Sequence, residues 1–243
     1  MNQSLEKKVE ERTALWVTAN TVKDRLLSVM SHDLKSPLNS LHGILHVYNS
    51  GAISKDEFNQ FTQQIEGDLN KTNMLVENVL YWTASQLKGV EMKAEKIDLT
   101  TLINENIQLF QTIAAKKQIA LSHNLPGTLT VHWDKNIINL VLRNLLANAI
   151  KFSYEGGEVK ILVEKVEHVL SIQVKDKGIG MNREVMTSIL SPGRASSNSG
   201  TGNEKGTGLG LSLCRDYLLK AGATMTVESM EGAGSTFTIN IPI

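Results

Sequence analysis

The spacing of apolar residues divides the chain into a helical first part and a mixed second part. Residues 5–48 are dense in good helix formers and contain no glycine before Gly43. Residues 49–51 (Asn-Ser-Gly) interrupt this pattern, and Ser54, which precedes two acidic residues, has the form of a helix start. We therefore predict two helices joined by a tight turn, that is, a helical hairpin.

Along the second predicted helix, a narrow apolar face repeats every three or four residues. Its positions are Phe58, Phe61, Ile65, Leu69, Thr72, Val76 and Val79. A face of this width suits packing against the first helix. Because two helices alone bury too little apolar surface, we predict that two copies of the hairpin form a dimeric four-helix bundle.

The start of the first helix, at residues 5–12, is highly charged, with sparse apolar positions. It is a solvated helix, a frayed tag-like end, or the last part of a coiled coil that enters from an upstream domain. We favour the coiled coil, because charges of both signs are mixed and the apolar spacing is helical. The predicted organisation of this part is an entering helix at residues 1–20 and the hairpin domain at residues 21–88.

The second part of the chain changes to a mixed pattern. Residues 85–96 are polar without a clear period, and we place a linker at residues 89–96. The elements predicted after it are a strand at 96–99, a helix at 101–117, a pair of strands at 119–122 and 129–133 that turn at Pro126-Gly127, a helix at 135–152, a hairpin of 157–165 with 169–175, a loop at 191–206, a helix at 207–221 and a closing hairpin of 224–229 with 235–241. The fold class is therefore α+β, with an α/β sandwich at residues 97–243 whose helices lie on one face.

Composition narrows the classes of protein that fit. Lysine plus arginine (25) equals aspartate plus glutamate (25), so we expect no nucleic-acid partner. The single cysteine, Cys214, cannot form an internal disulfide and lies in a helical pattern, which predicts a small buried side chain in a reducing compartment. No apolar run approaches the roughly 18 residues of a membrane span. We expect the chain as given to be cytoplasmic, and a longer natural protein could still carry a membrane anchor.

His32 is the first candidate for chemistry. A helix histidine with a pKa near the ordinary value of about 6.5 is mostly neutral in the cytosol, so its ring nitrogen can act as a nucleophile. Most such residues are simply surface positions. Here Asp33 is adjacent, and Pro37 has no N–H to donate to the carbonyl of Asp33, so the helix should loosen just after His32.

A second candidate is the helix predicted at residues 135–152. Asn144, Asn148 and Lys151 are spaced at i, i+4 and i+7, which places them on one helix face. An amide oxygen is a neutral hard ligand that suits Mg²⁺ already balanced by phosphates, and a lysine supplies a point charge to the phosphates. Taken alone, such a face is more often only solvated.

Two glycine patterns follow this helix. Asp176 directly follows a predicted strand and begins the run Asp-Lys-Gly-Ile-Gly, where a carboxylate can accept a hydrogen bond from the amine of adenine. The run at residues 206–211 (Gly-Thr-Gly-Leu-Gly-Leu) opens a helix, and N–H groups at a helix start bind phosphate. The run at residues 232–237 reads as a hairpin turn. Each pattern is weak alone, but their order and separations make the combination specific.

In these motifs the chain resembles the sensor histidine kinases of two-component signalling, over residues 21–243. The resemblance implies a dimeric phosphoacceptor hairpin, followed by an ATP-binding domain of the Bergerat type. That type is shared with DNA gyrase and with the chaperone and mismatch-repair ATPases. It further implies that His32 is the phosphoacceptor and that Asp33 orients or deprotonates it. Ser36 stands where the family normally has Thr or Asn to position water for dephosphorylation of the partner.

The resemblance also implies roles at a site for ATP and Mg²⁺. Asn148 would be the magnesium ligand, with Asn144 and Lys151 on the phosphates. The remaining implied contacts are Phe152 beside the adenine, Asp176 on its amine, Gly178 and Gly180 in the pocket wall, and Gly206, Thr207, Gly208, Leu209 and Gly210 at the lid and phosphates. One departure is that residues 186–194 lack the phenylalanines of the family, and Ile189 and Leu190 stand in their place.

The implied activity is ATP-dependent autophosphorylation of His32, followed by transfer to an aspartate in the receiver domain of a separate response regulator. The upstream sensory domain would be missing from this chain. Two alternatives stay open: a non-catalytic, dimeric ATP-binding scaffold, and an ATPase that uses water. The missing phenylalanines slightly favour the scaffold, whereas the His32-Asp33 pair opposes it. The ATPase would need an acidic residue one turn before Asn148, where Asn144 stands.

Overall fold

The computed structural model describes residues 38–62, 65, 69, 72–73, 76, 92–125, 127–190, 200–202 and 210–243. The chain divides into two compact units, Met1–Leu80 and Tyr81–Ile243. Within the described residues, no helix combines the length and the apolarity needed to cross a membrane.

The first unit is helical on both sides of a turn, as the sequence predicts. Residues 38–49 and 55–62 are helical, and the described residues between 65 and 76 continue in helical conformation. Ser54 begins the second helix through a capping box with Glu57. The Ser54 N–H donates to Glu57 Oε2 (2.9 Å), and the Glu57 N–H donates to Ser54 Oγ (3.3 Å). The bond from the Ser54 N–H holds the pKa of Glu57 below its usual range.

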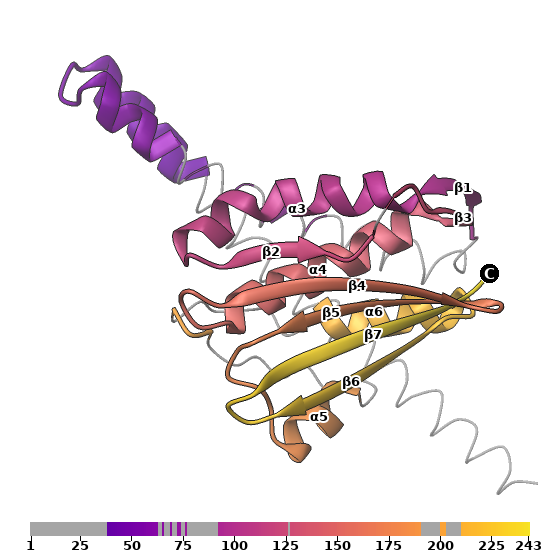
Figure 1. Cartoon of the computed structure of the whole chain (residues 1–243). Coiled ribbons are helices and arrows are strands. Elements are labelled where there is room, and N and C mark those ends of the chain that lie inside the picture. Colours follow the sequence, from indigo (N-terminus) through magenta and orange to yellow (C-terminus); the bar gives the residue numbers. More distant parts are fainter. Residues whose placement is uncertain are drawn as a thin grey trace, which may run out of the picture. The chain divides into compact units, whose positions relative to one another are not determined.

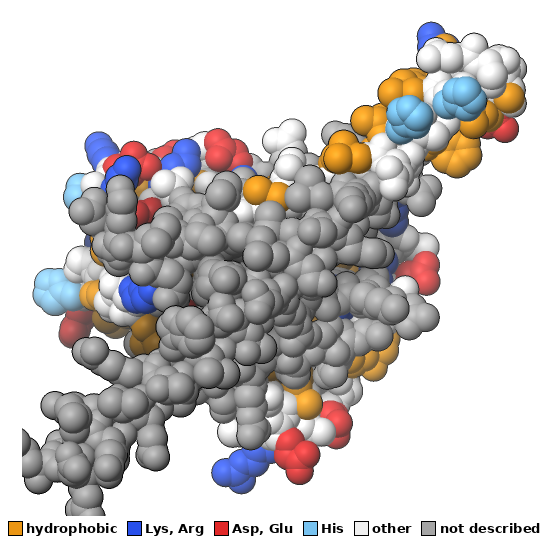
Figure 2. Space-filling model, turned by 180° about the vertical axis from the view of Figure 1, so that it is seen from behind, with side chains coloured by type: hydrophobic (Ala, Val, Ile, Leu, Met, Phe, Trp, Pro, Cys, Tyr) orange, Lys and Arg blue, Asp and Glu red, His pale blue; other side chains and the backbone are white. Residues whose placement is uncertain are grey.

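Aromatic packing joins the two helices of this unit. The rings of Tyr48 and Phe58 lie 4.3 Å apart between centroids. Ile65 is buried, whereas Leu45 and Phe61 are each 42% exposed in the single chain. Figure 2 shows apolar side chains gathered on the surface of the described part of the hairpin. An apolar face of this extent has no cover within one copy of the described residues.

The second unit contains both sheets and the remaining helices (Figure 1). Its elements are β1 (Ala94–Asp98), α3 (Leu99–Lys116), β2 (Ala120–His123), β3 (Thr130–Asp134), α4 (Lys135–Phe152), β4 (Glu158–Val166), β5 (Val169–Asp176), α5 (Arg183–Leu190), α6 (Gly210–Lys220), β6 (Thr224–Met230) and β7 (Gly234–Pro242). Five strands form one sheet in the order β2-β4-β5-β7-β6, in which only β2 and β4 are parallel. Strands β1 and β3 form a separate antiparallel pair.

Helices α3, α4 and α6 pack on one face of the five-stranded sheet, which confirms the predicted sandwich (Figure 1). Two aspartates start two of these helices. Asp98 accepts from the N–H groups of Thr100 and Thr101 at the start of α3, and Asp134 accepts from the first turn of α4. Cys214 in α6 is fully buried, as predicted, and burial raises the pKa of its thiol.

Strict alternation along β5 explains why a carboxylate is buried at its end. Leu170, Ile172 and Val174 face the helices and are almost fully buried, while the residues between them are more exposed. Asp176 is the next residue in the same phase, so its side chain points into the layer between sheet and helices, where it is 4% exposed. The strand thereby delivers an acidic group to the inner side of the sheet.

One prediction for this unit was wrong, one helix was not predicted, and one strand boundary moves. Strands β2 and β3 do not pair with each other, because β2 joins the edge of the large sheet beside β4 and β3 pairs with β1. The segment Arg183–Leu190 forms helix α5, which the sequence reading missed. Strand β1 runs from Ala94 to Asp98, so it starts two residues before the predicted strand at 96–99 and ends one residue earlier.

Candidate nucleotide-binding site

The centre of the candidate site is α4, which is buried on most of its surface. Leu142, Leu145 and Leu146 are completely buried, as the apolar pattern predicts. Asn148 and Lys151 are only half-buried, so their polar ends can reach a ligand. The helix therefore serves two purposes, since one side completes the core and the other side presents the asparagine and the lysine.

Asn144 lies one turn earlier, and the start of α6 covers it. It is only 9% exposed, and its amide Nδ2 donates back to the carbonyl of Leu140 (2.8 Å). Gly210, the first residue of α6, approaches so closely that a Cβ on it would collide with Asn144 Oδ1. This contact brings the end of the second glycine run onto the asparagine helix, and it gives a steric reason for glycine at position 210.

The C-terminal end of α4 meets the loop that follows β5. The Phe152 carbonyl accepts from the Ile179 N–H (3.1 Å), and Ser153 pairs with Gly178 as an isolated antiparallel bridge. A Cβ on Gly178 would collide with the Phe152 carbonyl, so the close approach requires glycine. The Lys151 ammonium lies 4.7 Å from the centre of the Phe152 ring.

Asp176 is held rigidly at this junction. Its Oδ1 accepts from the N–H of Gly178 (2.9 Å) and from the N–H of Ser235 (3.2 Å). Burial raises the pKa of Asp176, and these two bonds oppose the increase. Because both bonds from described residues go to Oδ1, the second oxygen, Oδ2, is left to accept a hydrogen bond from a ligand.

The turn between β6 and β7 supports the same loop. The Gly232 N–H donates to the Ile179 carbonyl (2.7 Å), and a Cβ on Gly180, which has a φ of +64°, would collide with the Met230 carbonyl. A Cβ on Gly234 would collide with the Asp176 carbonyl. The sequence predicts only a hairpin turn at residues 232–237. The second role of these residues, which is to hold Asp176 through the Ser235 N–H, depends on the pairing of β5 with β7.

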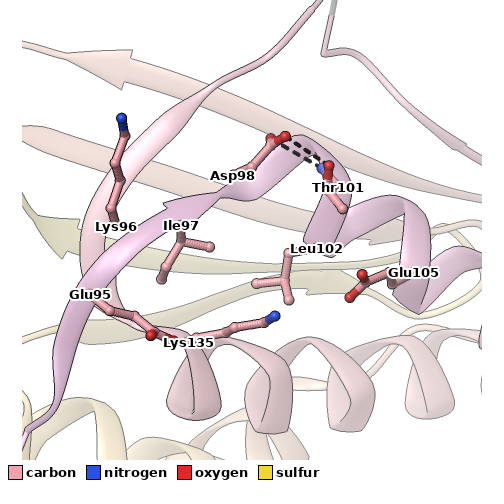
Figure 3. Close-up of a pocket in the computed structure, with 8 residues that line it drawn as sticks. All are labelled: Glu95, Lys96, Ile97, Asp98, Thr101, Leu102, Glu105 and Lys135. Atoms are coloured by element: carbon pink, nitrogen blue, oxygen red, sulfur yellow. Dashed lines mark hydrogen bonds between the residues drawn. The ribbon is translucent and has the colours of Figure 1, made fainter.

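A different cavity lies among the described residues of the β1–α3 region, with a volume of about 180 Å³ (Figure 3). It is lined by Glu95, Lys96, Ile97, Asp98, Thr101, Leu102, Glu105 and Lys135. Lys135 is the first residue of α4, and Asn148 is 13 residues further along, which is about 20 Å at 1.5 Å per residue. This cavity is therefore separate from the junction of Asp176 with α4.

The donor set around α4 fits a magnesium ion held mainly by phosphates. Among the described residues, no three His, Cys, Asp or Glu side chains cluster in a way that could enclose a metal ion. Mg²⁺ usually keeps several waters and takes one or two protein oxygens beside the phosphate oxygens. The half-buried amide of Asn148 can supply one such oxygen.

Several predicted site residues lie outside the described residues. These are His32, Asp33, Ser36, Gly206, Thr207, Gly208 and Leu209. Of the predicted nucleotide contacts, the structure brings together Asn144 with Gly210, and Phe152 with the loop that carries Asp176, Gly178 and Gly180. Their roles toward a ligand stay predictions.

Two family models match the chain. Residues 133–243 match the model described as histidine kinase-, DNA gyrase B- and HSP90-like ATPase, and residues 22–86 match the His kinase A (phospho-acceptor) domain. The two ranges hold the Asp176–α4 junction and His32, respectively. The chain therefore belongs to the sensor histidine kinases of two-component systems.

Individual relatives agree with this membership. Sensor protein EvgS of Escherichia coli (strain K12) is 29% identical over 234 residues, which are 93% of this chain and 19% of EvgS. The catalytic domain of histidine kinase ThkA is 31% identical, with a TM-score of 0.54, over 62% of this chain and 96% of that structure. Histidine kinase ThkA in complex with response regulator protein TrrA shares the fold, with 22% identity and a TM-score of 0.56 over 89% of this chain and 60% of that one.

The chain spans only part of its curated relatives, for example 19% of EvgS and 59% of the adaptive-response sensory kinase SasA of Synechococcus sp. (strain JA-3-3Ab).

Proposed function

We propose that this chain is the kinase core of a sensor histidine kinase, which transfers the γ-phosphoryl group of ATP to His32. The observation that carries the proposal is the buried carboxylate of Asp176, fixed beside the end of α4 in a chain that also has a phosphoacceptor-domain match around His32. The exocyclic amine of adenine could donate a hydrogen bond to Asp176 Oδ2. Because adenine is neutral, it would bring no second charge next to the carboxylate.

The residues of α4 divide the remaining work of binding. The adenine would lie beside Phe152, whose backbone carbonyl accepts from the Ile179 N–H. Lys151 and Asn144 would contact the phosphates. Asn148 would ligate Mg²⁺, and the bound ion would neutralise charge on the phosphates. Gly206, Thr207, Gly208, Leu209 and Gly210 are assigned to the phosphate side, since N–H groups at the start of a helix bind phosphate.

The proposed transfer is an in-line displacement. A ring nitrogen of His32 donates its lone pair to the γ-phosphorus, the bond from that phosphorus to the β–γ bridging oxygen breaks, and ADP leaves. The product is a phosphoramidate, and the carboxylate of Asp33 orients the ring or accepts its proton. Such transfers depend mostly on positioning and on charge stabilisation, which a rigid junction at Asp176 would supply.

The hairpin unit supports a dimer as part of the proposal. Exposed Leu38, Leu45 and Phe61 need a cover, and a second copy of the hairpin would provide it in a four-helix bundle. We assign residues 21–88 to this dimerisation and phosphotransfer domain and residues 97–243 to the catalytic domain. The input would come from a sensory domain on a longer protein, in line with the greater length of the relatives.

A response regulator is the proposed acceptor of the second transfer, from phosphohistidine to an aspartate. The complex of ThkA with response regulator protein TrrA supports this partner, because the two kinases share the fold. Ser36 has a hydroxyl that can orient water, so we include dephosphorylation of the regulator among the proposed activities.

Incubation of the chain with γ-labelled ATP and Mg²⁺ tests the proposal. We expect a label on the protein that is lost in acid and kept in base, which is the behaviour of a phosphoramidate. Nucleotide binding without any label would favour the scaffold instead. Steady turnover of ATP that persists in His32→Ala would favour an ATPase that uses water.

A further inference from the structure

The last turn of α4 has a complete set of hydrogen-bond partners. A helix leaves its four final carbonyls without partners from its own backbone. Here the Ala149 carbonyl accepts from the Ser153 N–H (3.0 Å) and the Phe152 carbonyl from the Ile179 N–H (3.1 Å). The two carbonyls between them, of Ile150 and Lys151, both accept from the ammonium of Lys117 (3.0 Å each).

A locked turn holds Lys117 in place. It caps the end of α3, and the next residue, Gln118, adopts a φ of +54°. The Lys117 carbonyl accepts from the Gly156 N–H (2.9 Å), and the Ala120 N–H donates to the Gly157 carbonyl (3.0 Å). The turn after α3 is thus joined to the turn after α4, so the ammonium reaches the end of α4 from a fixed base.

The third contact of Lys117 goes to Thr201. The ammonium donates to Thr201 Oγ1 (2.7 Å), and this hydroxyl in turn lies 2.7 Å from the Ser153 carbonyl, to which it donates. The Thr201 N–H donates to the Lys151 carbonyl (3.1 Å). The ammonium of Lys117 therefore joins the last turn of α4 to Thr201.

We propose that Lys117 is a positioning residue of the nucleotide site, and that it acts together with Thr201 by fixing the last turn of α4. The inference rests on the proposed ATP binding. That turn carries Lys151 and Phe152, the residues assigned to the phosphates and the adenine. Its final carbonyl also holds the loop after Asp176, through Ile179.

Both electrostatics and geometry allow Lys117 to fix the last turn of α4. A cation at a helix C-terminus lies at the negative end of the helix dipole, and its hydrogen bonds to carbonyls are charge-assisted. Without the ammonium, the carbonyls of Ile150 and Lys151 lose a donor in a half-buried place. The last turn would then sample other conformations, and the nucleotide would have to order it on binding. Lys117 lies outside both ranges matched by the family models, so neither match assigns it a role.

The experiment is a titration of the full chain with Mg²⁺ and a trinitrophenyl derivative of ATP, whose fluorescence reports binding without any turnover. Lys117→Met keeps most of the length of the side chain and removes the charge, whereas Lys117→Arg keeps the charge. Lys116→Met is the matched control, because Lys116 is the exposed neighbour in sequence. Thermal unfolding without nucleotide measures folding separately from binding.

We expect Lys117→Met to raise the Kd at least about fivefold, the lower end of typical coupling between sites, with Lys117→Arg closer to wild type and Lys116→Met unchanged. Thr201→Val should also weaken binding, and the double variant should bind no more weakly than Lys117→Met alone. A lower melting temperature with an unchanged Kd would overturn the inference, since it would show a purely structural role. If Lys117→Met does not fold, Thr201→Val decides, and an unchanged Kd in that variant overturns the inference. Absence of binding by the wild type would overturn the proposed function as well.

Discussion

Replacement of Asp176 by asparagine should separate nucleotide binding from stability, because the two depend on different oxygens of the carboxylate. The N–H groups of Gly178 and Ser235 both point at Oδ1, so the amide oxygen of the asparagine must take that position. The amide nitrogen then takes the place of Oδ2. A hydrogen-bond donor would face the amine of the adenine where an acceptor stood before.

The loss in affinity follows from that exchange. A hydrogen bond to a charged group contributes about 1.5–3 kcal/mol, and removing it here leaves two donors facing each other. This range corresponds to a roughly 10- to 150-fold increase in the Kd for ATP.

Asp176→Asn should weaken nucleotide binding but increase the stability of the folded chain. Burial raises the pKa of Asp176 in the folded chain above the ordinary value of 3.8. Between the unfolded and the folded pKa the native state binds more protons than the unfolded state, so stability falls as the pH rises through that window. Above the folded pKa the full cost of the buried charge remains. Asp176→Asn removes this cost, so the variant should be more stable than wild type at pH 7, and the difference should shrink as the pH falls through the folded pKa toward 3.8.

Two assays check this pair of effects. Fluorescence titration with the ATP analogue gives the Kd, and urea denaturation at pH 7 and at pH 4 without nucleotide gives the free energy of unfolding. A wild-type Kd in Asp176→Asn would refute the assignment of Asp176 to the adenine. A variant that is less stable than wild type at pH 7 would refute the argument from burial.

Two further predictions concern glycine and helix capping. Gly178→Ala should lower both the free energy of unfolding and the affinity for nucleotide, because the new Cβ would displace the Phe152 carbonyl. Gly127 has open space around it, so Gly127→Ala should change neither quantity in the same denaturation and titration series. Asp98→Ala should lower the denaturation midpoint at pH 7, since the hydrogen bonds from Thr101 hold the pKa of Asp98 below 3.8. That stabilisation is present above pH 3.8 and is lost as the pH falls through the folded pKa, so a constant difference between variant and wild type down to pH 2 would contradict the assignment.

Local patterns predict much of this architecture. The bounds of α4 and the hairpin of β4 with β5 follow from apolar periodicity, and the phase of β5 alone places Asp176 on the buried side of the sheet. The partner of β2 could not be predicted, because both β2 and β3 are short strands and their choice of sheet depends on contacts far away in sequence.

The contacts that support the site could not be predicted either, because they also join segments that are far apart in the sequence. Lys117 follows another lysine in an ordinary helix end, and nothing in its neighbourhood marks it. Its importance comes from segments 33 and 84 residues further along the chain, at Ile150 and Thr201. Ser235 acts through its backbone N–H, which any non-proline residue would offer.

The central claim is that His32 receives the γ-phosphoryl group of an ATP molecule bound with Mg²⁺ at Asn148. The most direct test is the label transferred from γ-labelled Mg-ATP to the wild-type chain, to His32→Ala and to Asn148→Ala, with binding of the ATP analogue measured in parallel. We predict an acid-labile label on the wild type and none on either variant, with analogue binding retained in His32→Ala. Undiminished labelling of His32→Ala, or a wild type that binds ATP and carries no label, would contradict the account.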